Sequence, residues 1–256
     1  MVSRLYHTEY AAHLFDGWQE TIIWSCLQNV MGAVYTDDQV NPGSAMAVLG
    51  DFCFFAGEPK EELVQYKPKS CKKDFIIMVP QSPGWAALVE QGYNERAKKV
   101  TRYAMKKEPD VFDTERLQRL TELPPGYELR MMDEELYYQC MREDWSRDLV
   151  SQYEDYETYQ KHGLGAVVLW EGEPVSGASS YSGYLGGIEI EIDTKEAYRR
   201  QGLAAACGAK LILACLERNL YPSWDAHNPE SAALARKLGY HLDGPYTAYE
   251  IWGYEE

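Results

Sequence analysis

Carboxylates, arginines and a glycine turn lie close together between residues 188 and 204. Glu189 and Glu191 alternate with isoleucines, so on a β-strand both carboxylates point to one face. The chain continues as Arg199-Arg200-Gln201-Gly202, a turn expected to open a helix. A carboxylate can take a proton from an ammonium group, and the start of a helix can hold an anion. The sequence therefore predicts a base beside a site that suits a pyrophosphate-bearing cofactor.

The anion site depends on the helix expected after Gly202. The first backbone N–H groups of a helix have no partner within it, and the macrodipole adds partial positive charge there. Gly202 and Ala204 leave room for a close backbone approach, and Arg199 and Arg200 add fixed positive charge. Residues that suit a buried face recur every four positions: Leu203, Cys207, Leu211 and Cys215. The helix start is therefore expected to be held in place. The alternative is an ordinary strand-to-helix turn.

A second segment follows with its own helix signals. Residues 224–227 are expected to form a short strand that leads into Asn228-Pro229-Glu230-Ser231. Asn228 is a suitable N-cap, proline is favoured at the first helical position, and Gly239 is the expected end of the helix. The predicted order is strand, anion-binding turn, long helix, strand, capped helix and a last strand over 240–252.

Two motifs in this order resemble the GNAT superfamily of acyl-CoA-dependent N-acetyltransferases. The first is Arg199-Arg200-Gln201-Gly202-Leu203-Ala204, and the second runs from Asn228-Pro229-Glu230-Ser231 through Lys237-Leu238-Gly239-Tyr240. The resemblance covers about the last half of the chain. With its long N-terminal extension, the chain is also similar to the subgroup that includes zwittermicin A resistance-type acetyltransferases.

The resemblance implies an α/β fold of the α+β type with a mixed sheet, and acetyl-CoA as cosubstrate. It implies that the backbone of Ile192, Asp193 and Thr194 pairs with the pantetheine arm, and that Asn228 lies near that arm. It assigns the pyrophosphate to the backbone around seven residues: Arg199, Arg200, Gln201, Gly202, Leu203, Ala204 and Ala205. Ala235 stands where many relatives carry a tyrosine as general acid, so protonation of the departing thiolate is unassigned.

The transfer needs a base that removes a proton from the acceptor ammonium. We expect Glu191 to be this base and Glu189 to be the second candidate, since family members often use a glutamate or a relayed water on this strand. The alternative for each is a structural ion pair with Lys or Arg. His227 is a lower-ranked candidate, and Asp225 shares its face of the short strand.

Length and composition favour two domains. The chain has 256 residues, 45% of them hydrophobic, which suffices for two cores. Pro124-Pro125-Gly126 follows a helical stretch over 113–121 and predicts a border near residue 125. Residues 126–256 form the GNAT-like domain in this division. Residues 1–125 are expected to form a mixed α/β domain of unknown role, and a degenerate acyltransferase-like unit is one hypothesis for it.

The first domain offers both helix and strand signals. Apolar residues at helical spacing predict a helix through Phe15, Trp18, Ile22 and Cys26. Apolar runs at 45–49, 52–56 and 75–79 predict strands.

Charge limits the classes of partner. Residues 1–125 hold 14 basic and 17 acidic side chains, and residues 126–256 hold 11 and 23, which gives nets of −3 and −12. The negative second domain repels phosphate backbones, so we expect no nucleic acid and favour a small, cationic, amine-bearing acceptor. Acidic and aromatic residues over 133–157 suit such an acceptor. The alternative is a solvated acidic helix pair whose aromatics are core.

Other classes of site lack sequence support. The six cysteines and five histidines show no metal-ligand or disulfide spacing, so we expect no metal. We also expect no membrane span and no signal peptide, and hence a cytoplasmic enzyme, with an oligomer possible. The predicted function is transfer of an acetyl group directly to a primary amine. A non-catalytic acyl-CoA-binding sensor or interaction module is the alternative, and a longer acyl group or a peptide N-terminus as acceptor remains open.

Overall fold

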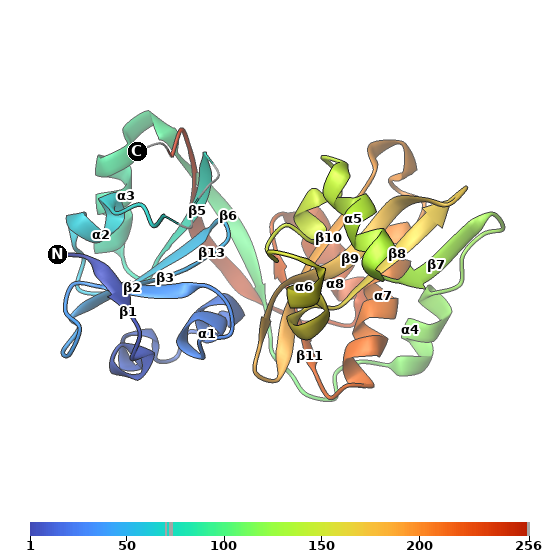
Figure 1. Ribbon diagram of the computed structural model, residues 1–256, viewed down its shortest axis with the longest axis horizontal. Helices are drawn as coiled ribbons and strands as arrows, with labels where there is room; N and C mark the ends of the chain where they lie inside the picture. Colours follow the sequence, from blue (N-terminus) through green and yellow to red (C-terminus); the bar gives the residue numbers. More distant parts are fainter. Residues whose placement is uncertain (70, 72–73, 255–256) are drawn as a thin grey trace. The chain divides into compact units, whose positions relative to one another are not determined.

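The computed structural model describes residues 1–69, 71 and 74–254 and divides the chain into two compact units (Figure 1). Unit 1 comprises the residues up to Arg102 and those from Pro245 onward, and unit 2 runs from Tyr103 to Gly244. The border expected near residue 125 differs from these limits. The reason is packing, because Met105 and Leu117 belong to the hydrophobic core of unit 2.

Unit 1 is built around a mixed sheet. Its strands are β1 (Ser3–Leu5), β2 (Ala33–Thr36), β3 (Ser44–Leu49), β4 (Phe52–Gly57), β5 (Phe75–Pro80), most of β6 (Ala97–Met105) and most of β13 (Leu242–Trp252). They lie in the order β1-β2-β3-β4-β5-β13-β6. The pairs from β1 to β4 are antiparallel, β4 and β5 are parallel, and β13 is antiparallel to β5. The strands predicted at 45–49, 52–56 and 75–79 are confirmed.

Short helices connect the strands of unit 1. They are η1 (Thr8–Tyr10), η2 (Ala12–Phe15), α1 (Thr21–Leu27), α2 (Glu61–Gln65), α3 (Pro83–Tyr93) and η3 (Asn94–Arg96). The single helix predicted through Phe15 and Cys26 is wrong. The chain breaks at Gly17, whose φ of 78° is left-handed, so η2 and α1 are separate elements.

Unit 2 repeats this plan around a second sheet. Its strands are β7 (Tyr127–Met131), β8 (Gly165–Trp170), β9 (Glu173–Tyr184), β10 (Gly187–Thr194), β11 (Tyr221–Ser223) and β12 (Asp225–Ala226). The first five lie in the order β11-β10-β9-β8-β7, and only the pair of β10 and β11 is parallel. β12 instead pairs antiparallel with the end of β6, where Asp225 faces Ala104. The strand expected over 224–227 is therefore shortened to two residues.

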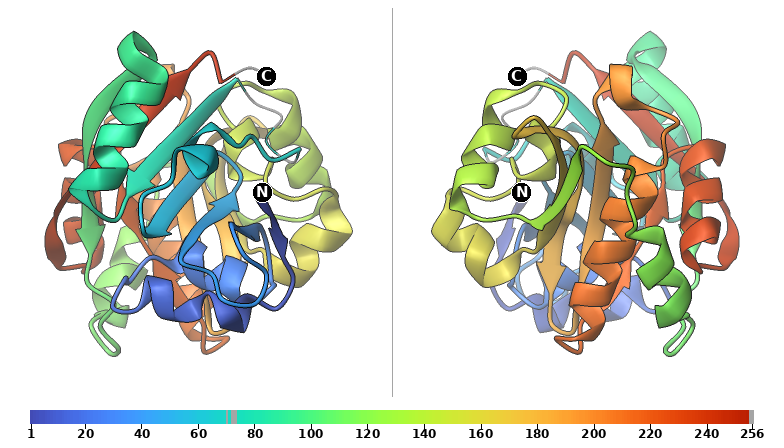
Figure 2. Two further views of the ribbon diagram at one scale, coloured as in Figure 1. Left: turned by 90° about the vertical axis from the view of Figure 1, so that its left-hand side faces the viewer. Right: turned by 90° about the vertical axis from the view of Figure 1, so that its right-hand side faces the viewer.

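Most helices of unit 2 lie at places in the strand order that match helices of unit 1. They are α4 (Thr114–Leu120), α5 (Glu134–Arg142), η4 (Arg147–Leu149), α6 (Tyr156–His162), η5 (Glu196–Tyr198), α7 (Leu203–Leu216) and α8 (Pro229–Leu238). Figure 2 shows α7, in orange, lying along the strands of unit 2 with α4, in green, beside it. The long apolar helix, the capped helix and the helix over 113–121 are confirmed.

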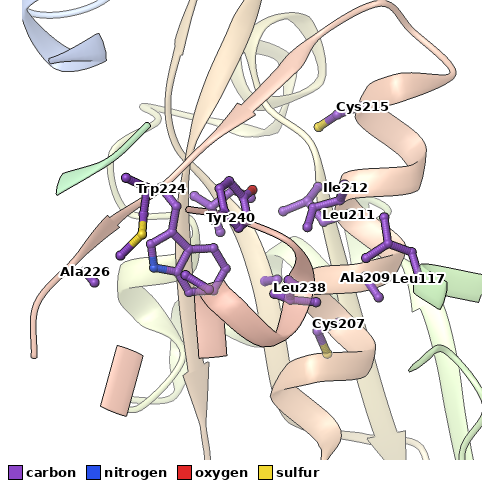
Figure 3. Packing of buried hydrophobic residues seen from close by; sticks show 14 of the residues in the cluster. Leu117, Cys207, Ala209, Leu211, Ile212, Cys215, Trp224, Ala226, Leu238 and Tyr240 are labelled. Carbon is purple, nitrogen blue, oxygen red and sulfur yellow. The ribbon is translucent and has the colours of Figure 1, made fainter. Parts of the chain in front are cut away.

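The core of unit 2 fixes the position of α7. Ten of its fourteen residues are buried, which exceeds the one face that the four-residue spacing predicted. In Figure 3, Tyr240 lies between Trp224 and the α7 side chain of Ile212, and all three belong to one hydrophobic core. Tyr240 donates a hydrogen bond of 2.6 Å to the carbonyl of Pro222, which ties the end of α8 to β11. The start of α7 is thus held by the packing of the whole helix.

The two units share one strand order. In each, four antiparallel strands are followed by a fifth strand parallel to the fourth, and a helix precedes that fifth strand. In unit 1 the fifth strand pairs next with β13, whereas in unit 2 the fifth strand β11 is the edge of its sheet and the end of β6 pairs with β12 instead. This order supports the hypothesis that unit 1 is an acyltransferase-like unit, which stays a hypothesis.

The place of β13 in unit 1 generates a prediction. Ile251 lies near the C-terminal end of the chain but is fully buried in the unit 1 core, opposite Ile76. We expect Ile251→Ala to lower the free energy of unfolding by about 2 to 5 kcal/mol, because a cavity opens in a packed core. Chemical denaturation measures this loss. Leu242→Ala, at the exposed start of the same strand, is the matched control and should cost less than about 1 kcal/mol. Equal effects of the two changes would contradict the account.

Candidate functional site

The parallel pairing of β10 and β11 is short. It covers three residue pairs, from Gly187 opposite Tyr221 to Glu189 opposite Ser223. Beyond this point β10 continues to Thr194 alongside β9, whereas the chain after Ser223 turns to pair with β6. Two parallel strands that separate in this way leave backbone groups available to an extended ligand arm. Ile192, Asp193 and Thr194, the predicted partners of a pantetheine arm, lie on the part of β10 beyond the separation.

The turn after β10 leads to the start of α7 with an open backbone. Arg200 and Gly202 both have left-handed φ angles, 61° and 85°. Gly202 is the N-cap of α7, and no side chain among the described residues makes a capping hydrogen bond to the start of this helix. A side-chain carbon at Gly202 would meet no atom within 4 Å. The first N–H groups of α7 therefore keep their capacity for a ligand, and the geometry fits a bound diphosphate.

The arginines of this turn differ in their contacts. The Nε atom of Arg199 donates to the carbonyl of Thr194 at 3.0 Å, and its Nη2 atom lies 3.6 Å from Asp193 Oδ1. Arg199 thus braces the turn against β10, a contact that the sequence did not predict. Arg200 is exposed. Gln201 accepts a hydrogen bond of 2.8 Å from the hydroxyl of Tyr127, which ties the turn to β7.

The two candidate bases occupy different surroundings on β10. Glu189 is 6% exposed, and it lies opposite Ser182 on β9 and Ser223 on β11. Glu191 is half-buried and lies opposite Ser179. The register of β9 shifts between Glu189 and Ile190, which marks a β-bulge at this level. Bulges re-aim side chains, and the alternation pattern of the sequence gave no sign of it.

Tyrosines cluster around the buried glutamate. Burial raises the pKa of Tyr184, whose hydroxyl lies 3.0 Å from Ser223 Oγ, and the charge of Glu189 raises this pKa further. Burial also raises the pKa of Tyr221, and Glu189 again adds to the effect. The charge of Glu189 is therefore felt at both of these tyrosine hydroxyl groups.

The second motif forms the predicted cap. Asn228 Oδ1 accepts a hydrogen bond of 2.8 Å from the backbone N–H of Ser231, and Gly239 ends α8 with a φ of 116°. This side-chain oxygen is committed to the helix, which leaves the amide N–H₂ of Asn228 for a ligand. Ala235 is fully buried in the core, so a hydroxyl is missing where many relatives carry a tyrosine. His227 is exposed and Asp225 is half-buried.

Several residues of the acidic and aromatic segment over 133–157 have structural roles. Tyr137 and Tyr153 are buried, and burial raises the pKa of both. Tyr153 donates to Ser180 Oγ at 2.8 Å and accepts, through its carbonyl, a bond of 3.2 Å from the hydroxyl of Tyr137. The carboxylates of Asp133 and Asp155 cap α5 and α6. For these two tyrosines the alternative that the aromatic residues of this segment are buried in the core is confirmed.

The equivalent turn of unit 1 has different chemistry. β4 is followed by Glu58-Pro59-Lys60, and the first turn of α2 carries Glu61 and Glu62. Carboxylates at a helix start repel phosphate, and α2 has only five residues. Of the two equivalent turns, only that of unit 2 fits a diphosphate.

These features match a known family over most of the chain. The sequence profile described as GNAT acetyltransferase matches residues 12–249. The chain belongs to the GNAT acetyltransferase family. As a member it is an acyltransferase, and acyl-CoA is the acyl donor that the family uses.

Relatives of full length support the assignment. The chain is 29% identical to the uncharacterized N-acetyltransferase YdfB of Bacillus subtilis (strain 168), with 91% of each chain covered. It is 48% identical to a GCN5-related N-acetyltransferase-like protein from Streptococcus suis 89/1591, whose structure covers 96% of this chain and 98% of its own, with a TM-score of 0.90. A GCN5-related N-acetyltransferase from Sphaerobacter thermophilus, 14% identical with a TM-score of 0.59 and coverages of 99% and 95%, shares the fold. The closer likeness to zwittermicin A resistance-type proteins stays a prediction.

Other kinds of site lack support among the residues that the structure describes in this GNAT protein. None of its described helices is long and apolar enough to cross a membrane. Within the same residues, no group of three His, Cys, Asp or Glu side chains is arranged to hold a metal ion.

The contacts of Asp193 generate a prediction on pH. Burial raises the pKa of Asp193, and the N–H of Thr194 and the charge of Arg199 oppose this effect only in part. A raised carboxyl pKa favours the folded state at acid pH, and this contribution is lost as the pH rises through the folded-state value. We therefore expect Asp193→Asn to raise the free energy of unfolding relative to the wild type more at pH 7 than at pH 4. Urea denaturation at the two pH values measures the difference. A larger gain in the free energy of unfolding at pH 4 than at pH 7 would contradict a raised pKa of Asp193.

Proposed function

We propose that unit 2 binds acetyl-CoA and transfers the acetyl group directly to the primary amine of a small cationic molecule. The observation that carries this proposal is the open turn at Gly202, which leads into a buried helix beside the separating strands β10 and β11. The N–H groups at the start of α7 would hold the diphosphate. The backbone of Ile192, Asp193 and Thr194 would pair with the pantetheine arm, and Asn228 would lie near it.

The chemistry follows from this placement. The amine nitrogen attacks the thioester carbonyl carbon, a C–N bond forms and the C–S bond breaks. Most of the rate enhancement would come from holding the amine beside the thioester. Backbone N–H groups near Ile192 to Thr194 would polarise the thioester carbonyl. The departing thiolate must then take up a proton. Ala235 has no proton to donate, so another donor supplies it.

The base is proposed on β10. Glu191 is the first candidate and Glu189 the second. Glu191 lies beyond the last pair of β10 and β11, on the stretch proposed to hold the arm, whereas Glu189 lies at the last pair. Either carboxylate would accept the ammonium proton before attack.

The acceptor class rests on charge. Residues 126–256 carry a net charge of −12, the difference between 11 basic and 23 acidic side chains. This field attracts cations and opposes polyanions. The family supports an amine acceptor, and the charge supports a cationic one.

Binding of acetyl-CoA is tested by a pair of glycine variants. Gly202 and Gly172 have nearly the same left-handed φ, 85° and 84°, and open space beside them, so valine strains both backbones alike. Only Gly202 lies at the proposed diphosphate site. We expect Gly202→Val to weaken acetyl-CoA binding roughly tenfold or more, through lost charge-assisted hydrogen bonds, and Gly172→Val to leave it unchanged. Titration calorimetry measures both. An unchanged affinity of the Gly202→Val variant for acetyl-CoA would refute the proposed diphosphate site.

The base is tested by amide substitutions. Gln keeps the size of the side chain but cannot accept the proton, so Glu191→Gln should lower kcat by about 10²- to 10⁴-fold with little change in acetyl-CoA affinity. Glu189→Gln is the comparison. Steady-state kinetics with an amine identified by screening give the answer. If the Glu191→Gln variant keeps full turnover and the Glu189→Gln variant loses it, Glu189 and not Glu191 is the general base. Acetyl-CoA binding without turnover of any amine would favour the sensor alternative.

A further inference from the structure

A hollow at the C-terminal end of α8 has basic side chains in its lining. It has a volume of about 350 Å³, near the lower end of the range for small-molecule sites. Asp113 and Arg116, at the start of α4, line one part of it, and Arg236 and His241, at and after the end of α8, line another. All of these residues belong to unit 2. Two guanidinium groups and an imidazole therefore border one small volume.

The hollow is separate from the candidate acyl-CoA site. Asn228, which would lie near the pantetheine arm, is the N-cap at the start of α8, whereas Arg236 lies in the last turn. A helix of ten residues is about 15 Å long, so the two residues lie at opposite ends of α8. None of the described residues that line the hollow belongs to β10 or to the turn over 199–205. A ligand in the hollow would therefore not occupy the place of the cosubstrate.

The two arginines of the hollow have no acidic partner. Within residues 1–69, 71 and 74–254, neither the Arg116 nor the Arg236 guanidinium group forms an ion pair or a side-chain hydrogen bond. Arg119, also on α4, instead lies 4.0 Å from the carboxylate of Glu115. A guanidinium group offers five N–H donors in a planar fork that matches an oxyanion. Both arginines of the hollow therefore keep these donors for a ligand.

The carboxylates near the hollow are engaged. Asp113 Oδ1 accepts the backbone N–H of Arg116 at 2.9 Å and so caps α4. Glu108 Oε2 lies 2.7 Å from His241 Nδ1. Because a carboxylate only accepts hydrogen bonds, the Nδ1–H of His241 is the donor, and this bond orients the imidazole. These contacts reduce the repulsion that an anion would meet in the hollow.

The end of α8 is also closed by its own hydrogen bonds. The carbonyl groups at a helix C-terminus carry partial negative charge and disfavour anions. Here the carbonyl of Ala235 accepts from the N–H groups of Gly239 and Tyr240, both at 3.1 Å, and that of Arg236 accepts from Gly239 at 3.2 Å. The charges that remain beside the end of the helix are those of the arginines.

The base of the hollow is apolar and well packed. Leu238 and Tyr240, both labelled in Figure 3, are 1% and 2% exposed and belong to the core of unit 2. Val111 and Leu242 add further apolar surface to the lining. A ligand can thus place a short hydrocarbon part on this surface while its charged groups meet the arginines.

We propose that this hollow binds a small organic dianion, a phosphate monoester or a dicarboxylate. The guanidinium groups of Arg116 and Arg236 hold its oxygen atoms, and Val111 and Leu238 contact its hydrocarbon part. His241 forms a wall of the site. Binding needs no acyl-CoA, so this site stands or falls independently of the transfer proposed for the other end of α8.

The test is calorimetric titration of the full chain without acetyl-CoA, with sodium chloride keeping the ionic strength constant. Phenyl phosphate and glutarate are the probes, and the one that binds distinguishes a phosphate monoester from a dicarboxylate. We expect at least one of them to bind, and phenol, the neutral analogue, to bind roughly tenfold or more weakly than phenyl phosphate if that is the ligand. Arg116→Gln and Arg236→Gln should each weaken binding roughly tenfold, through lost charge-assisted hydrogen bonds. Circular dichroism checks the fold of each variant.

A matched variant controls for charge. Arg119→Gln removes one positive charge from α4 outside the hollow and should leave affinity for the dianion unchanged. Failure of both dianions to bind would overturn the proposal. So would equal binding of phenyl phosphate and phenol, unchanged affinity in folded Arg116→Gln and Arg236→Gln, or an equal loss in Arg119→Gln.

The Gly202→Val variant separates this site from that of the cosubstrate. It should bind the dianion as the wild type does, whether or not it binds acetyl-CoA. Loss of dianion binding in Gly202→Val with full binding in Arg116→Gln would place the anion at the start of α7 and overturn the proposal.

Discussion

The short parallel pairing of β10 and β11 is the constraint on which the candidate site depends. It ends after Glu189 and Ser223, so the two strands separate beside the turn that opens α7. The burial of α7 fixes the N–H groups at its start, and the separation exposes the edge of β10 to an extended arm. The proposed diphosphate site and the proposed backbone partners of the pantetheine arm therefore depend on one local feature. The glutamates of β10 are placed by the same strand.

The second constraint is the exchange of strands between the halves of the sequence. β13 completes the sheet of unit 1, and the end of β6 pairs with β12 in unit 2. Unit 1 thus depends on residues from the far end of the chain, whereas unit 2 is one continuous segment whose first strand residues pair with β12. The units share a strand order but differ at the turn after the fourth strand, where unit 1 carries Glu61 and Glu62 and unit 2 carries Arg200 and Gly202. One strand order therefore carries an acidic helix start in unit 1 and an open turn with an exposed arginine in unit 2.

Local signals predicted much of this fold. The periodicity over 203–216, the cap at Asn228 and the apolar strands of unit 1 act within a few residues, so they are legible in one sequence. The true limits of the units were not predicted, because strand exchange is a long-range property. The bulge between Glu189 and Ile190, the brace of Arg199 on Thr194 and the bond from Tyr127 to Gln201 were also missed. They depend on neighbours that only the folded sheet brings together. The break at Gly17 was overlooked although glycine itself was the signal.

The central claim is that one of two like-folded units has kept the diphosphate turn. Counting the acetyl-CoA molecules bound per chain tests this claim most directly, and native mass spectrometry across a titration gives the number. The account predicts saturation at one molecule per chain. Two molecules per chain would show that unit 1 binds the cosubstrate despite its acidic turn, and none would show that the turn at Gly202 is only a scaffold.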